Sequence, residues 1–217
     1  ARAMNPIARA QLVLGTALAL VLASGAASAV EFNDHEKARL AAGKTVKKPM
    51  AKAGKNGVYG GSAYTLIDAP ADLIWAAIED WGSYKKIYPK TVSVKEVSRK
   101  GDKSLVRMEQ GHKLISVAYH VEVNKDPAKK MISFKLVKNK PHDIEETKGY
   151  WRLFPQSDGR TLVAYVVAVQ VPAGLVNLLG DNLSDQLARA LLNVPGKLKK
   201  WVEGPNGNRY RVMTAKK

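Results

Sequence analysis

The feature that most constrains the fold is an amphipathic segment near the C-terminus, residues 181–202. Asp181 is a candidate N-cap, and the Gly-Pro pair at 204–205 is a candidate stop signal. Pro195 interrupts the segment and predicts a kink or a break into two helices. Such a helix must lie on an apolar surface. Its large apolar residues recur every three or four positions, which places them on one helix face: Leu183, Leu187, Leu191, Val194, Leu198 and Trp201.

Most of the chain before this helix is predicted to form that surface as a β-sheet. Turn-forming residues separate the candidate strands, and the short spacings favour an antiparallel meander over crossover connections. Alternation of apolar and polar residues gives one apolar face, as expected of a sheet curled around the helix. Between the first two strands, residues 69–81 and 83–88 are predicted to form two short helices. The predicted strands are residues 58–68, 92–99, 105–111, 114–124, 131–138, 145–154 and 161–171.

The order of these elements resembles the START-like helix-grip superfamily, which includes polyketide cyclase-like and coenzyme Q-binding proteins. The likeness covers roughly residues 58–202. It implies an α+β fold, in which a curved antiparallel β-sheet wraps around a long C-terminal α-helix and two short helices follow the first strand. The segments that carry the resemblance are residues 67–75, Asp80, Tyr84, Tyr88-Pro89, residues 149–153 and residues 158–161.

The N-terminus has the pattern of a secretory signal peptide. Arg9 precedes an apolar run over residues 12–22, and Ala27-Ser28-Ala29 matches a cleavage site. The alternative is an uncleaved membrane anchor, although the run is shorter than the roughly 20 residues that a span needs. The expected organisation is a signal peptide at 1–29, a basic N-terminal extension at 30–57 with a short helix between residues 31 and 42, a ligand-binding domain at 58–204 and a C-terminal tail at 205–217. Export implies a periplasmic location.

The charge balance points to an anionic partner. The chain has 35 basic and 19 acidic residues, a formal net charge of +16, and no cysteine, which excludes disulfides and a thiol nucleophile. Export and the burial of most aromatics in apolar patterns argue against nucleic acid, so an anionic membrane surface is the expected partner. The segments around Lys129 and Lys140 would then form the rim of an opening. We expect the protein to be a monomer. In the alternative interpretation, the lysines only keep the protein dispersed.

The sequence offers little for catalysis. Its four histidines show no metal-binding spacing, and there is no Gly-x-Ser-x-Gly motif. We therefore expect no metal, no cofactor and no enzymatic activity. The alternative is a polyketide cyclase-like enzyme acting on a hydrophobic substrate, for which Glu109, His112 or His120 would have to serve as acid-base groups.

The remaining expectation is a hydrophobic cavity between sheet and helix, used to bind or transfer a lipid or other hydrophobic small molecule in the periplasm. Sterols, hopanoids, fatty acids, phospholipids and quinones all remain open. The alternative is that the same residues only pack the core. Tyr119 and Tyr165 could each orient a polar head group. The candidate lining residues are Met108, Val117, Tyr119, Phe134, Trp151 and Tyr165 from strands, with Leu183, Leu187 and Leu191 from the helix.

Overall fold

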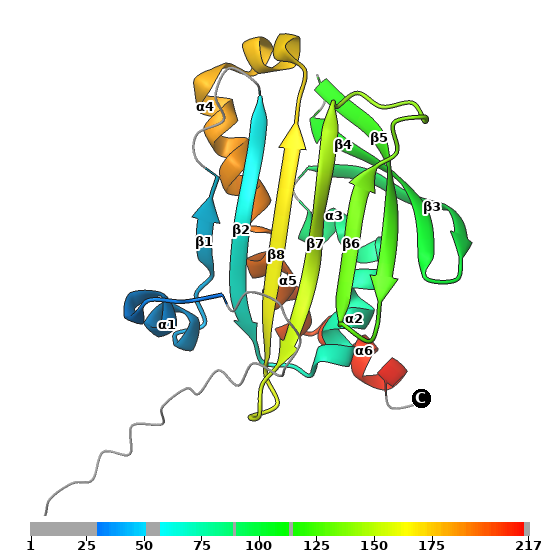
Figure 1. The fold of residues 1–217 in the computed structure, drawn as a ribbon. Coiled ribbons are helices and arrows are strands. Elements are labelled where there is room, and N and C mark those ends of the chain that lie inside the picture. Colours follow the sequence, from blue (N-terminus) through cyan, green and yellow to red (C-terminus); the bar gives the residue numbers. More distant parts are fainter. Residues whose placement is uncertain (1–29, 51–56, 89, 113–114, 215–217) are drawn as a thin grey trace, which may run out of the picture.

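The protein is an α+β fold built on one eight-stranded antiparallel sheet (Figure 1). The computed structural model describes residues 30–50, 57–88, 90–112 and 115–214. The strand order is β1-β2-β8-β7-β6-β5-β4-β3. The predicted strands are confirmed as β2 to β8, with ends shifted by a few residues. The strands are β1 (Val46–Pro49), β2 (Val58–Ile67), β3 (Thr91–Lys100), β4 (Lys103–His112), β5 (Ile115–Asp126), β6 (Met131–Leu136), β7 (Glu146–Pro155) and β8 (Thr161–Gln170).

The helices that follow β2 gather on one face of this sheet, whereas α1 packs against the other face. The two C-terminal helices α4 and α5 pass behind β2 and β8, and α2 and α3 lie behind the strands that follow (Figure 1). The helices are α1 (Asp34–Ala41), α2 (Ala71–Glu79), the 3₁₀ turn η1 (Trp81–Ser83), α3 (Tyr84–Ile87), α4 (Ala173–Leu192), α5 (Val194–Glu203) and α6 (Gly207–Thr214).

The predicted break in the C-terminal helix is confirmed, but its predicted start is wrong. Helix α4 ends at Leu192, and Pro195 lies in the first turn of α5, where the missing N–H costs no helical hydrogen bond. Helix α4 begins directly after Pro172, so Asp181 lies inside the helix and does not cap it. The apolar residues upstream of Asp181 belong to the same helix.

Residues of the predicted N-terminal extension pack onto the sheet. Helix α1 begins with a capping box between Asn33 and Glu36, which confirms the short helix expected there. Residues 43–57 are rich in lysine and glycine and are expected to be extended or loosely ordered; within them β1 is extended and pairs with β2 as an edge strand. A second apolar cluster joins these elements to the outer face of the sheet: Phe32, Leu40, Val46, Tyr64, Leu66, Leu162 and Ala164.

Glycines allow β2 to pair closely on both sides. A Cβ atom at Gly60 would lie 1.9 Å from the carbonyl oxygen of Val167 in β8, and one at Gly61 would lie 2.3 Å from the carbonyl oxygen of Lys48 in β1. Both glycines have a positive φ that other residues rarely adopt. These two positions therefore require glycine.

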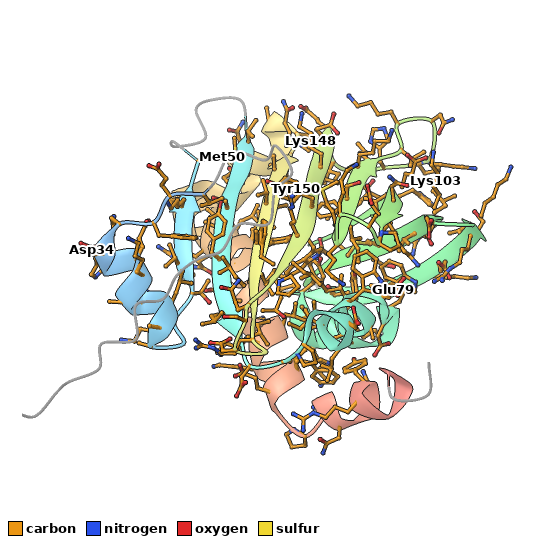
Figure 2. All side chains as sticks on the ribbon, turned by 60° about the horizontal axis from the view of Figure 1, so that its bottom comes forward. Asp34, Met50, Glu79, Lys103, Lys148 and Tyr150 are labelled. Atoms are coloured by element: carbon orange, nitrogen blue, oxygen red, sulfur yellow. The ribbon has the colours of Figure 1, made fainter. Side chains whose placement is uncertain are left out.

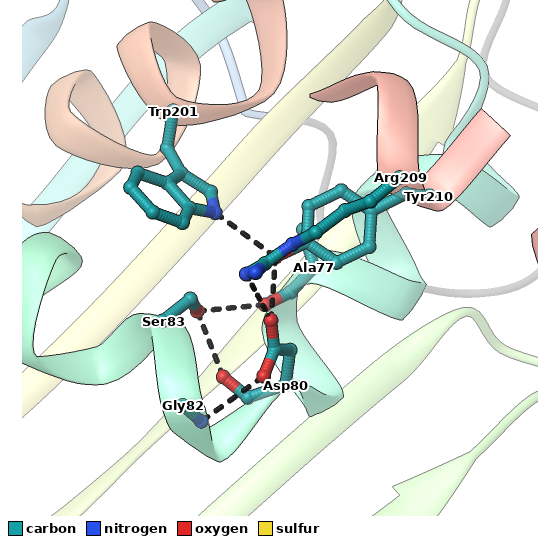
Figure 3. A network of polar contacts seen from close by, with 7 residues as sticks. All are labelled: Ala77, Asp80, Gly82, Ser83, Trp201, Arg209 and Tyr210. Atoms are coloured by element: carbon teal, nitrogen blue, oxygen red, sulfur yellow. Dashed lines mark hydrogen bonds and ion pairs between the residues drawn. The ribbon is translucent and has the colours of Figure 1, made fainter. Parts of the chain in front are cut away.

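The predicted C-terminal tail forms helix α6, which contacts α2 and α5. The Tyr210 hydroxyl donates to Asp80 Oδ2 at 2.7 Å and accepts from Trp201 Nε1 at 2.9 Å. Arg209 adds an ion pair to the same carboxylate, whose other oxygen accepts from Gly82 N at 3.0 Å (Figure 3). We call this group, Asp80, Trp201, Arg209 and Tyr210, the C-terminal clamp. It joins the end of α2 to α5 and α6.

Candidate ligand-binding cavity

A cavity of about 580 Å³ lies between the inner face of the sheet and the helices. Its size falls within the roughly 300–1,000 Å³ typical of small-molecule sites. Strands β4, β5, β6, β7 and β8 form one wall, and η1, α3 and α4 contribute the other side. Most of its lining is apolar or aromatic. The curved sheet and the helices laid across it leave a space that their side chains do not fill.

Eight of the nine predicted lining residues border this cavity. Their side chains come together because alternate residues of a strand point to the same face. Leu183 lies in α4, but its side chain is outside the described residues. Whether these residues contact a ligand stays a prediction. The eight are Met108, Val117, Tyr119, Phe134, Trp151, Tyr165, Leu187 and Leu191.

Sequence reasoning missed the contribution of η1, α3 and the following loop. Tyr84 and Tyr88 lie four residues apart, a spacing that places them on one side of a helical turn, and this was the available signal. The loop residue Lys90 and the helix residue Gln186 had no periodic pattern to mark them. The missed lining residues include Trp81, Tyr84, Tyr88, Lys90, Gln110, Ile144, Thr147 and Gln186.

Buried aromatic rings form a rigid wall in the cavity. Tyr84 and Tyr88 stack with ring centroids 4.6 Å apart, and Trp151 and Tyr165 are 4.3 Å apart. Trp151 Nε1 donates a hydrogen bond to the Tyr88 hydroxyl at 3.0 Å, which fixes the two rings relative to each other. Phe134 stacks on Tyr165 at 6.4 Å. This wall offers flat apolar surface with hydroxyl groups at fixed positions.

The phenols of this wall are neutral at physiological pH. Burial raises the pKa of Tyr88 and of Tyr119 far above the ordinary value of a tyrosine. Burial also raises the pKa of Tyr84 and of Tyr165. These hydroxyls therefore act as hydrogen-bonding dipoles and not as charges.

The polar lining residues gather where the cavity opens. Lys90 and Gln186 border the cavity and are exposed, which places the mouth between the start of β3 and helix α4. The Tyr119 hydroxyl donates to Gln110 Oε1 at 2.7 Å. Gly111 N donates to the carbonyl oxygen of Lys90 at 2.8 Å and ties the loop to β4. The mouth thus combines a cation, amides and a phenol.

Only one of the two expected rim segments lies at this end. Val117 at the start of β5 and Thr147 at the start of β7 border the cavity, so the β6–β7 loop that carries Lys140 is at the mouth end. The β5–β6 hairpin at Lys129 closes the opposite ends of its strands (Figure 1). There Lys130 Nζ lies 3.1 Å from Asp72 Oδ1 of α2. Placing Lys129 at the opening was therefore wrong, because β5 runs away from the mouth.

Two of the three acid-base candidates, Glu109 and His120, face away from the cavity. In β4, Met108 and Gln110 face the cavity, so Glu109 faces outward, where Arg107 Nη1 lies 3.2 Å from its carboxylate. His120 also faces outward, with Nδ1 at 3.1 Å from the carbonyl oxygen of Pro141. The side chain of His112 is outside the described residues. The described ranges contain no group of three residues suited to hold a metal ion.

A sequence profile for polyketide cyclase / dehydrase and lipid transport proteins matches residues 67–193. The chain belongs to this family. The match runs from the end of β2 to the junction of α4 and α5, so it contains every strand and helix that lines the cavity. The START-like resemblance is thereby confirmed, and with it the curved sheet and C-terminal helices of the helix-grip fold.

Solved structures share this fold. An aromatase/cyclase from Streptomyces sp. R1128 is 20% identical with a TM-score of 0.53, and the match covers 67% of this chain and 96% of that chain. A STAR-related lipid transfer protein from Xanthomonas axonopodis is 12% identical with a TM-score of 0.52, over 73% and 99%. A protein from Thermus thermophilus is 18% identical with a TM-score of 0.54, over 67% and 96%. No protein of curated function matches the sequence.

Proposed function

We propose that the protein binds a lipid or another hydrophobic small molecule in this cavity and carries it within the periplasm. The observation that carries the proposal is the cavity itself, about 580 Å³ lined mainly by apolar and aromatic side chains. Transfer of apolar surface from water into such a space is favourable by roughly 25 cal/mol per Å². The family to which the chain belongs includes lipid transport proteins by its description.

Support for a periplasmic location comes from the N-terminal sequence. Arg9, the apolar run over residues 12–22 and the Ala27-Ser28-Ala29 site form the pattern of a cleaved leader. These residues lie outside the described ranges. Among the helices that the structure describes, none has the length and apolar character needed to cross a bilayer.

A cyclase-like activity on a hydrophobic substrate is the second candidate. The family description includes cyclases, and the Streptomyces aromatase/cyclase shares the fold. With Glu109 and His120 facing outward, the described groups that could take part in such chemistry include the hydroxyls of Tyr88 and Tyr119 and the Lys90 amine. This candidate would be favoured over a carrier if the protein cyclised a polyketide substrate and if Tyr119→Phe abolished that turnover without loss of substrate binding.

Native mass spectrometry of the protein purified from its own host tests the proposal. We expect a mass in excess of the polypeptide that disappears on extraction with organic solvent, and a hydrophobic molecule in the extract. The Leu187→Trp variant should carry less of it, because the larger side chain fills part of the cavity. The proposal would be contradicted by protein that carries no bound molecule when purified from its host and that, after refolding, takes up none of a panel of lipids.

A further inference from the structure

One charged residue stands out in the wall of the cavity. Among the described residues that border the cavity, Lys90 is the one with a charged side chain, and this side chain lies at the mouth. No acidic partner is found for it among the described residues. Lys90 thus adds positive charge at the end of a space that is otherwise apolar.

The fold holds Lys90 in this place at a local cost. Its φ is +53°, a left-handed conformation that glycine and asparagine adopt more readily than lysine. The hydrogen bond from Gly111 N to the Lys90 carbonyl oxygen and the pairing of Thr91 with Gln110 keep the residue at the mouth. The backbone conformation at this position does not favour lysine. What lysine supplies here is its side chain, which a ligand could contact.

Neighbouring amides complete a site for oxygen atoms. The Tyr119 hydroxyl donates to Gln110 Oε1, and the Gln110 amide nitrogen donates to Thr91 Oγ1 at 3.5 Å, which leaves its second N–H for a ligand. Gln186 borders the mouth from α4. An ammonium and amide N–H groups are the donors that a carboxylate or a phosphate accepts from.

We propose that the ligand is an amphiphile with an anionic head, a carboxylate or a phosphate, which binds Lys90 at the mouth while its apolar chain fills the cavity toward Trp151 and Tyr165. This inference deepens the proposed function and rests on it. It differs from the sequence-based expectation, in which Tyr119 and Tyr165 orient the head group, because Tyr119 is already bonded to Gln110 and Tyr165 lies in the aromatic wall.

A competition assay with matched sixteen-carbon compounds tests this inference. The neutral fluorophore N-phenyl-1-naphthylamine reports cavity occupancy, and hexadecanoic acid, hexadecyl phosphate and hexadecanol compete for the cavity. We expect at least one anionic compound to bind about tenfold or more tightly than the alcohol, the factor of one charge-assisted hydrogen bond. The two anionic arms show whether the site prefers a carboxylate or a phosphate.

Three variants assign the preference to Lys90. Lys90→Met should reduce the preference for the anion over the alcohol to near unity while hexadecanol binds as before. Lys90→Asn should do the same with an equal or higher Tm, because asparagine accepts the left-handed backbone. Lys86→Met is the matched control, since Lys86 is exposed on α3 and does not border the cavity, and it should keep the preference.

Each other outcome overturns the inference in a distinguishable way. If the alcohol competes as well as both anions, the head group is not recognised, although the cavity still binds hydrophobic molecules. If Lys86→Met removes the preference as Lys90→Met does, the net charge of the protein is responsible and Lys90 is not. If neither the fluorophore nor any competitor binds folded protein, the proposed function fails together with the inference.

Discussion

Leu187 and Leu198 offer a direct comparison between a cavity wall and a packed core. Leu187 borders the cavity from α4, whereas Leu198 on α5 is fully buried and does not border it. We expect Leu187→Trp to weaken displacement of a bound fluorophore by lipids with little change in the urea midpoint. Leu198→Trp should instead destabilise the protein by about 1–3 kcal/mol through overpacking. A sharply lowered midpoint for Leu187→Trp with unchanged lipid binding would show that Leu187 packs a core.

The buried tyrosines predict how stability depends on alkaline pH. An unfolded chain releases its phenolic protons near pH 10. Burial raises the pKa of Tyr84, Tyr88, Tyr119 and Tyr165, so above pH 10 the folded state holds more protons than the unfolded state. Their contribution to stability is thus complete below pH 10 and is lost as the pH rises further. Absorbance at 295 nm should show these phenols ionising together with the loss of near-ultraviolet circular dichroism; ionisation of all eight tyrosines in folded protein would contradict this.

Sequence patterns found the residues on long strands and missed those on short turns. Val117, Tyr119 and Phe134 were identified because period-two alternation assigns each residue of a strand to a face. Tyr88 and Lys90 follow a helix of a single turn, where the four-residue spacing from Tyr84 to Tyr88 is the one periodic signal and nothing indicates where Lys90 points. The left-handed backbone at Lys90 leaves no mark in the sequence, since lysine is not a residue that favours it.

Among the elements, the C-terminal clamp makes a testable contribution to stability. The Tyr210 hydroxyl links Asp80 of the α2–η1 junction to Trp201 of α5. Tyr210→Phe should cost about 1 kcal/mol of unfolding free energy, because it removes the hydrogen bonds that the hydroxyl makes with the partly buried Asp80 and Trp201. Urea denaturation measures this. Tyr150→Phe, on a residue that is 37% exposed (Figure 2), is the matched control and should stay within about 0.5 kcal/mol. Equal midpoints for the two variants would show that the clamp contributes nothing.

Elements that depend on tertiary contacts were the ones that the sequence could not reveal. Strand β1 is four residues long and contains two lysines and a proline, so it has no apolar alternation of its own, and it exists because β2 offers a free edge. Helix α6 likewise has few apolar residues and is placed by Tyr210. By contrast, the break between α4 and α5 was predicted from Pro195 alone. A proline inside a helix removes a backbone hydrogen bond whatever the helix packs against.

For the whole molecule, the distribution of charge predicts docking to an anionic bilayer at the cavity mouth. Lys90 and Lys140 lie at that end, and each lysine near an anionic surface contributes about 1 kcal/mol within a Debye length. Liposome sedimentation should show binding to anionic vesicles that weakens with salt, and little binding to neutral ones. Lys140→Glu should reduce this binding more than Lys103→Glu, because Lys103 lies at the β3–β4 turn, where β4 pairs with the far end of β5 (Figure 2). Equal effects of the two variants, or binding that ignores lipid charge, would contradict docking at the mouth.

The N-terminal pattern makes a separate prediction about processing. N-terminal sequencing of the exported protein should begin at or near Val30, directly after Ala27-Ser28-Ala29. Recovery of protein that still contains Met4 would contradict cleavage and would favour a carrier tethered to the membrane.

The pairing of β2 with β8 has a consequence for the order in which the chain folds. Val58 pairs with Gln170 and Ile67 with Thr161. Strand β2 can therefore pair with β8 only after the strands between them in the sequence have been synthesised. Closing so long a loop is entropically costly and slows folding. We therefore expect a nascent chain to complete this sheet only after β8 is synthesised, and for a chain exported as proposed this delay would leave time for a translocase that threads only unfolded chains.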